Sequence, residues 1–192
     1  AGYNLLMPLG DFDKTIWQGL NGPIWALIAL DSGNYTIPKN TTAKTQSTRQ
    51  LFVDEILNRQ QKDGGWTLDD TGDSDPDMTA MVLQALAKYQ DQSAVKAATD
   101  KALTFLSKAQ DRNGGFASWG TVNAESTAQV IVALCELGIS LDDSRFVKNG
   151  HGLIENLLTY RQSNGSFTHT LDSAEGNNQM ATEQCFYALV AA

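Results

Sequence analysis

A repeat of about 50 residues constrains the fold of this chain more than any other feature of its sequence. A glycine turn followed by an aromatic residue occurs three times, at 63–66, 113–116 and 164–167, so that successive turns lie 50 and 51 residues apart. A fixed period of this length is the signature of repeat folds, in which each unit packs mainly against its neighbours. The chain is therefore expected to be built from similar units placed side by side.

A helix-like segment follows each turn, and its sequence is repeated as well. These type A segments are 77–86, 125–134 and 180–189, with Thr at the third place and Ala-Leu at the end; a fourth, 21–30, has Pro23 at the third place. Three type B segments, 47–60, 93–110 and 146–162, have apolar residues at helical spacing. Ser47 and Ser93 are expected as N-caps. The pattern predicts seven alternating helices and no β-strand.

The type A segments have one uniform face and one variable face. Their seventh and tenth places are all large and apolar, which predicts that these residues point into the core. Their first, fifth and eighth places mix polar and aromatic residues, whereas a plain solvated face would favour Lys and Glu. We therefore interpret this face as the wall of a cavity, with a solvated face as the alternative. The candidate ligand-binding residues on it are Trp25, Asp77, Met81, Glu125, Gln129, Gln184 and Tyr187.

The segments 60–66 and 101–116 resemble the glutamine–tryptophan repeat of the terpenoid cyclase and protein prenyltransferase superfamily, with Phe116 in place of Trp. The resemblance implies an all-α fold, an α/α toroid of alternating inner and outer helices around a central cavity. A closed toroid has more helices than seven, which implies an incomplete ring. We expect residues 1–192 to form a single domain that is a fragment of a longer chain. Trp66 and Phe116 are expected to wedge between helix pairs.

The segments 21–31, 75–80 and 125–129 resemble prenyltransferase-like repeat domains of bacterial surface proteins. That group is similar in turn to the cobalamin-binding toroids of the intrinsic factor type. The resemblance implies a secreted or cell-surface protein, with a cobalamin-like or isoprenoid ligand. A small molecule, a protein partner and the remainder of the parent chain are the expected partners.

The segment 75–80 also resembles the acid motif of class II terpene cyclases, Asp-X-Asp-Asp-Thr-Ala. Asp77 takes the place of the proton-donating Asp, but Met78 replaces the Asp that follows it. A proton-donating carboxyl depends on its hydrogen-bonding neighbourhood, so the missing carboxylate argues against this chemistry. We expect Asp77 to be ionised and to act as a helix cap or polar rim residue. A cyclase-like enzyme with Asp77 as its acid is the alternative.

Two metal sites can be weighed from the sequence. The two histidines, His151 and His169, do not combine with the cysteines into the Asp, Cys and His zinc set of prenyltransferases. Asp73, Asp75 and Asp77 alternate as in a calcium loop, but the Gly and Glu of an EF-hand are missing. An irregular calcium site is therefore the alternative to a solvated turn.

Charge and hydropathy exclude two further classes of partner, nucleic acid and the interior of a membrane. A formal net charge of −8 argues against nucleic acid as a partner, and the longest apolar run, 24–30, is too short to cross a bilayer. We therefore expect a non-catalytic module that binds a ligand or partner near the N-termini of the type A helices, with a structural scaffold as a further alternative. The last helix, 179–192, is expected to leave an exposed apolar edge.

Overall fold

The computed structural model describes residues 2, 4–69, 71–172, 176 and 178–192. The type A segments form α2 (Asn21–Ser32), α4 (Pro76–Leu86), α6 (Ala124–Glu136) and α8 (Gln179–Ala191). The type B segments form α3 (Arg49–Asn58), α5 (Ser93–Ala109) and α7 (Leu153–Thr159). The other elements are α1 (Phe12–Thr15), the 3-10 helices η1 (Met7–Gly10), η2 (Ile16–Gln18), η3 (Ala87–Tyr89) and η4 (Ser144–Phe146), and the strands β1 (Ala117–Ser118) and β2 (Thr121–Val122).

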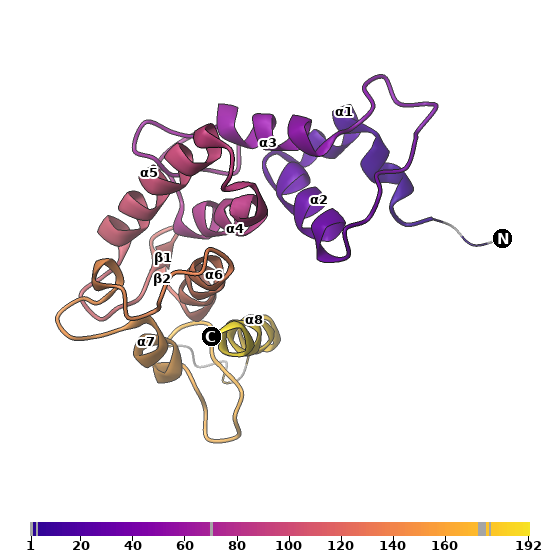
Figure 1. The fold of residues 1–192 in the computed structure, drawn as a ribbon. Coiled ribbons are helices and arrows are strands. Elements are labelled where there is room, and N and C mark those ends of the chain that lie inside the picture. Colours follow the sequence, from indigo (N-terminus) through magenta and orange to yellow (C-terminus); the bar gives the residue numbers. More distant parts are fainter. Residues whose placement is uncertain (1, 3, 70, 173–175, 177) are drawn as a thin grey trace.

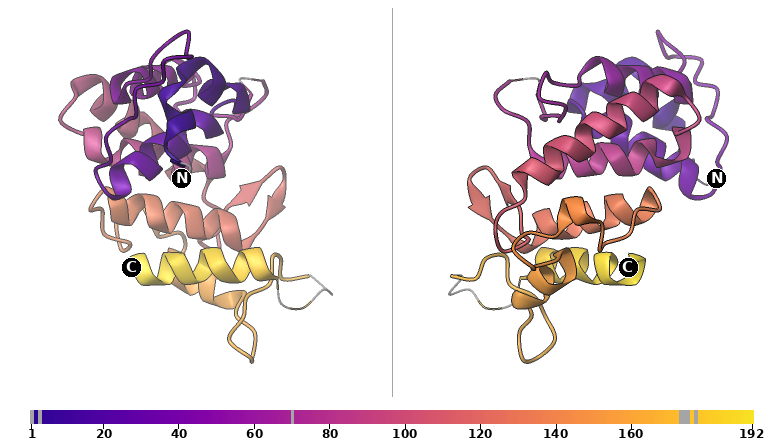
Figure 2. Two further views of the ribbon diagram at one scale, coloured as in Figure 1. Left: turned by 90° about the vertical axis from the view of Figure 1, so that its right-hand side faces the viewer. Right: turned by 60° about the vertical axis from the view of Figure 1, so that its left-hand side comes forward.

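The helices form two curved layers. The inner helices follow one another along the arc, with α2 packed on α4, α4 on α6 and α6 on α8. The outer helices α3, α5 and α7 pack on α2, α4 and α6 respectively. In Figure 1, α2 and α8 lie at opposite ends of the arc, and Figure 2 shows α6 and α8 side by side. The fold is thus the predicted all-α arrangement of alternating inner and outer helices, open on one side.

The apolar places of the inner helices form the core. Those of α2, α4 and α6 are fully buried, namely Leu27, Leu30, Leu83, Leu86, Ile131 and Leu134. On α8 the same places are only partly covered, since Phe186 is exposed and Leu189 is half-buried. The last inner helix therefore has an exposed apolar face, as predicted for the edge of the arc.

The glycine turns join one repeat to the next. Gly64 and Gly114 have φ of +97° and +83°, a conformation that favours glycine, and Trp66 and Phe116 are fully buried behind them. Gln60 Nε2 donates to the Gly64 carbonyl and to the Ala98 carbonyl of α5, each at 2.9 Å. Gln110 makes the matching pair of hydrogen bonds to the carbonyls of Gly114 and Phe146. The glutamine of each glutamine–tryptophan repeat therefore binds the glycine turn that follows it to the next outer helix, α5 for Gln60 and η4 for Gln110.

Two predictions about the type B segments are wrong. The segment 146–162 is not one helix, because a turn with positive φ at Asn149 and Gly150 separates η4 from α7. The expected caps also differ: Thr48, not Ser47, accepts from Leu51 N at the start of α3, and α5 has no side-chain cap. Moving the start of a helix by one residue changes its cap, because only the extended residue directly before the helix places its side chain beside the first helix amides.

The structure also contains a short β-hairpin where no strand was predicted. Strands β1 and β2 pair antiparallel through Ala117–Val122 and Ser118–Thr121. Trp119 and Gly120 form the turn, with φ of +52° and +81°. Two successive positive φ angles suit the twist of a two-residue hairpin. The hairpin places Trp119 beside the N-terminal end of α4, as the next section describes.

Candidate functional site

A cavity of about 360 Å³ opens at the N-terminal ends of the inner helices, and we call it the mouth. All four inner helices, the hairpin and the turn before α4 contribute to its wall. The lining residues are Asn21, Trp25, Leu68, Asp75, Asp77, Met78, Met81, Ser118, Trp119, Gln129 and Gln184. They include the fifth place of every type A segment. Five of the seven candidate residues thus lie together, namely Trp25, Asp77, Met81, Gln129 and Gln184.

Asp75 caps α4 and anchors the hairpin. Its Oδ1 accepts hydrogen bonds from the backbone N–H groups of Asp77 and Met78, at 2.9 and 3.1 Å. Its Oδ2 accepts a hydrogen bond from Ser118 Oγ at 2.6 Å. Of the two roles expected for Asp77, the helix cap is therefore wrong, because Asp75 occupies the extended N-cap position, and the role at the polar rim is left.

Asp77 is a carboxylate in an unfavourable environment. Its Oδ1 is buried and has no hydrogen-bond partner. Burial raises the pKa of Asp77 from 3.8 to about 6, and the charges of Asp75 and Glu125 add to this effect, while the hydroxyls of Ser126 and Ser118 lower the pKa and offset it in part. The rest of the side chain is partly exposed and lines the mouth. Asp77 is therefore a partly buried carboxylate that stabilises no helix amide and takes up a proton in mildly acidic solution.

Glu125 does not line the mouth, although it occupies the same place on α6 as Asp77 does on α4. It is 5% exposed, and its Oε2 lies 2.9 Å from Nδ1 of His169, in the segment after α7. Its Oε1 is buried without a hydrogen-bond partner. The expected position of Glu125 on the cavity wall is corrected accordingly, because its contact with His169 holds it below the surface.

A ladder of glutamine amides crosses the concave face. Gln84 Nε2 donates to Gln129 Oε1 at 2.8 Å, and Gln129 Nε2 donates to Gln184 Oε1 at 3.1 Å. The ladder links α4, α6 and α8, so the polar residues of the variable face pair with one another across neighbouring repeats. Gln84 lines a second cavity, whereas Gln129 and Gln184 line the mouth.

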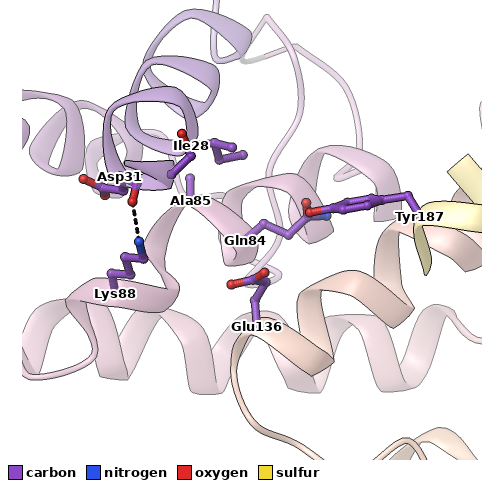
Figure 3. Close-up of a pocket in the computed structure, with 8 residues that line it drawn as sticks. Ile28, Asp31, Gln84, Ala85, Lys88, Glu136 and Tyr187 are labelled. Carbon is purple, nitrogen blue, oxygen red and sulfur yellow. Dashed lines mark hydrogen bonds between the residues drawn. The ribbon is translucent and has the colours of Figure 1, made fainter. Parts of the chain in front are cut away.

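Tyr187 lies in that second cavity and not in the mouth. The cavity has a volume of about 160 Å³ and is lined by Ile28, Asp31, Ser32, Gln84, Ala85, Lys88, Glu136 and Tyr187. Figure 3 shows the Tyr187 ring reaching from α8 toward Gln84, with Lys88 donating to the Asp31 carbonyl oxygen on the far side. Tyr187 stands at the eighth place, about one turn beyond the fifth. Its expected place beside Asp77 is therefore corrected.

Trp119 is a mouth residue that the repeat alignment did not identify. It stands at the tip of the hairpin, is 85% exposed and lines the mouth. Among the described residues, a hairpin forms in the loop of this repeat alone, and the corresponding loops differ in length and sequence, so comparison between repeats does not identify Trp119. The dipeptide Trp119-Gly120 between two short polar segments was the available signal, since glycine is typical of tight hairpin turns.

The calcium alternative for Asp73, Asp75 and Asp77 stays a prediction, and the described part of the chain gives it no support. No group of three or more His, Cys, Asp or Glu side chains there could hold a metal ion. Asp75 uses both of its oxygens in the hydrogen bonds above, while Asp73 is exposed. Among the described helices, none is long and apolar enough to cross a membrane.

A solved structure and a family model agree with this architecture. A search of curated proteins finds no match. Among solved structures, the chain is similar to Candida albicans protein geranylgeranyltransferase-I complexed with GGPP, with a TM-score of 0.61 and 16% identity over 90% of this chain and 49% of that chain. The chain thus spans about half the length of that protein. The family model of the squalene-hopene cyclase C-terminal domain matches residues 67–188. This match covers well over half of the sequence, and the chain belongs to the squalene-hopene cyclase C-terminal domain family.

Proposed function

We propose that this chain is a non-catalytic module that binds a small molecule in the mouth. The observation that carries the proposal is the convergence of side chains from all four inner helices and the hairpin on one cavity of about 360 Å³. The wall combines apolar side chains with several polar groups, and a concave site that offers both kinds of contact is typical of ligand binding. The amides of Gln129 and Gln184 are held by their ladder and offer fixed polar contacts.

The openness of the mouth favours binding over catalysis. Trp25 is 48% exposed and Trp119 is 85% exposed, so water reaches the aromatic walls. Cyclisation through a carbocation needs a cavity that excludes water, because water captures the intermediate. Met78 also stands where the cyclase motif has a second carboxylate. These features support a binding module of a secreted or cell-surface protein, with an isoprenoid or cobalamin-like ligand.

Native mass spectrometry tests the proposal directly. The protein is mixed separately with geranylgeraniol and with cobalamin, and a one-to-one complex with either ligand is expected. Met81→Arg places a long charged side chain in the mouth and should abolish the complex. Met7→Arg is the matched control, because Met7 lies on η1 and does not line the mouth. Absence of any complex, or equal binding by both variants, would contradict the proposal and favour a scaffold role.

The second candidate function is a class II cyclase-like enzyme with Asp77 as its acid. The observation in its favour is the buried Oδ1 of Asp77, which has no hydrogen-bond partner, together with the raised pKa of this carboxyl. Squalene is incubated at pH 6 with the wild type and with Asp77→Asn. A cyclic product that forms only with the wild type would establish the enzyme and overturn the non-catalytic proposal.

A further inference from the structure

The charged residues described in the wall of the mouth are all acidic. Its wall contains the carboxylates of Asp75 and Asp77, and none of the described residues that line it is Lys, Arg or His. Glu125 lies buried close enough to raise the pKa of Asp77 through its charge. Within the described residues, Asp77 also has no ion-pair partner. A cation entering the mouth would relieve this repulsion, whereas an anion would add to it.

Aromatic faces accompany these carboxylates. Trp25 from α2 and Trp119 from the hairpin line the same cavity, and both are accessible to solvent. The hydrogen bond from Ser118 Oγ to Asp75 Oδ2 fixes the hairpin to the start of α4, so Trp119 is held beside the acidic groups. An indole face attracts organic cations through its electron-rich ring, and this attraction grows where water is partly excluded.

We propose that the mouth binds the cationic group of a small organic molecule, such as a quaternary ammonium, with Asp77 as the counter-charge and Trp25 and Trp119 as the aromatic walls. This inference rests on the proposed ligand-binding function. An ammonium with alkyl substituents combines positive charge with apolar surface, and the mouth offers both complementary features. A ligand whose charge is a phosphate or diphosphate would meet two carboxylates and no described basic side chain.

Choline and 3,3-dimethyl-1-butanol test the charge requirement, because the two molecules have nearly the same shape and differ in charge. Binding is followed through the indole N–H signals in NMR spectra of the whole chain. Choline should shift the signals of Trp25 and Trp119. Trp17 is the internal control, since it is 86% exposed but does not line the mouth. The neutral alcohol should bind at least about fivefold more weakly than choline, as loss of the cation–π and charge attraction implies. Phosphocholine, the lipid headgroup form, should also bind more weakly than choline.

Matched variants test the assigned residues. Asp77→Asn and Trp119→Ala should each weaken choline binding at least about fivefold. Asp100→Asn and Trp17→Ala remove the same groups from exposed positions outside the mouth and should leave binding unchanged. Equal affinity for choline and the neutral alcohol, or full binding by Asp77→Asn, would overturn this inference. Binding of geranylgeraniol in that case would leave the proposed function standing, whereas failure of all these ligands would overturn both.

Discussion

Two aspartates at the start of α4 show how strongly the surroundings decide what a residue does. Asp75 accepts two backbone N–H groups and the Ser118 hydroxyl, so its charge is compensated. Asp77, two residues later, has a buried oxygen that accepts no hydrogen bond. The same side chain therefore stabilises the fold at one position and stores an unfavourable charge at the other. Such stored charge is common where a protein meets a ligand.

The raised pKa of Asp77 predicts a pH-dependent cost to stability. The folded pKa of about 6 lies above the usual 3.8, so between these values the unfolded state loses its proton first and stability falls as pH rises. Above about pH 6 the charged Asp77 lowers the free energy of unfolding by its full amount, and this loss no longer changes with pH. Asp77→Asn removes this charge, and we expect its stability relative to wild type to rise by about 2–3 kcal/mol between pH 4 and pH 7.

Urea denaturation at several pH values measures the free energy of unfolding for this comparison. Asp100→Asn is the control, because Asp100 is well exposed on the outer helix α5. Its stability should follow that of the wild type across the same range. Parallel curves for Asp77→Asn and wild type would show that Asp77 has an ordinary pKa in the folded protein.

The aromatic residues of the glycine turns should matter for stability. Trp66 is fully buried and its Nε1 donates to the Ile56 carbonyl of α3 at 2.8 Å, while Phe116 is fully buried in the next repeat. Replacing either residue with Ala should reduce the free energy of unfolding by about 3–5 kcal/mol, as for other large buried aromatic residues. Trp17→Ala should change it by less than about 0.5 kcal/mol, since Trp17 is exposed. If both substitutions reduce the free energy of unfolding by less than about 1 kcal/mol, the aromatic residues of the turns do not hold neighbouring helix pairs together.

At the scale of elements, three of the four inner helices start in the same way, whereas α2 has no side-chain cap. Asp75, Asn123 and Asn178 cap α4, α6 and α8 through their side chains, each two residues before the first place of its type A segment. Thr79 and Thr182, both at the third place, accept from the backbone N–H of the aromatic turn residues Trp66 and Phe167. At α4 and α8 the repeated threonine therefore ties the inner helix to the turn before it, whereas Thr127 of α6 donates to Asn156 Oδ1 of α7 instead.

This shared start predicts different effects for two substitutions of Asp75. Asp75→Ala removes the cap of α4 and the anchor of the hairpin, and it should cost about 1–2 kcal/mol of stability. Asp75→Asn keeps an acceptor for the helix amides and should cost clearly less, because Asn is a good N-cap. Urea denaturation of both variants provides the comparison. If they lose the same stability, capping is not the main role of this side chain.

At the scale of the whole molecule, the arc ends in a face of α8 that no described inner helix covers, although the Phe186 ring contacts Phe167 edge-on at 5.9 Å. Met180, Tyr187 and Val190 are more than half exposed, and Phe186 is as well. The preceding inner helices bury the corresponding side against the next helix along the arc. That further repeats of the parent chain cover α8 stays a prediction.

The exposed face should make the isolated chain self-associate. Val190 is 83% exposed, and Val190→Lys should shift the distribution toward monomer in sedimentation velocity at high concentration. Leu158→Lys is the control, because Leu158 is also exposed but lies on the outer helix α7. Concentration-independent sedimentation of the wild type would show that the face is tolerated in water.

The sequence by itself determined the repeat, the alternation of two kinds of helix and the face of each inner helix that meets the core. These are local properties, because helix periodicity and turn glycines act over a few residues. The common fifth place also predicted four residues that the structure brings to one cavity, namely Trp25, Met81, Gln129 and Gln184. Similar repeats pack side by side, so equal places on their inner helices become neighbours in space even though the loops between them differ in length.

Only the tertiary structure decided which polar groups are satisfied. Glu125 turns to His169, 44 residues away, while Asp77 at the matching place has no such partner. Trp119 reaches the mouth because a hairpin in one repeat happens to bond to Asp75 of the repeat before it. Burial and hydrogen-bond partners depend on contacts between segments that are distant in the sequence, and these contacts cannot be predicted from the spacing of residues along the chain.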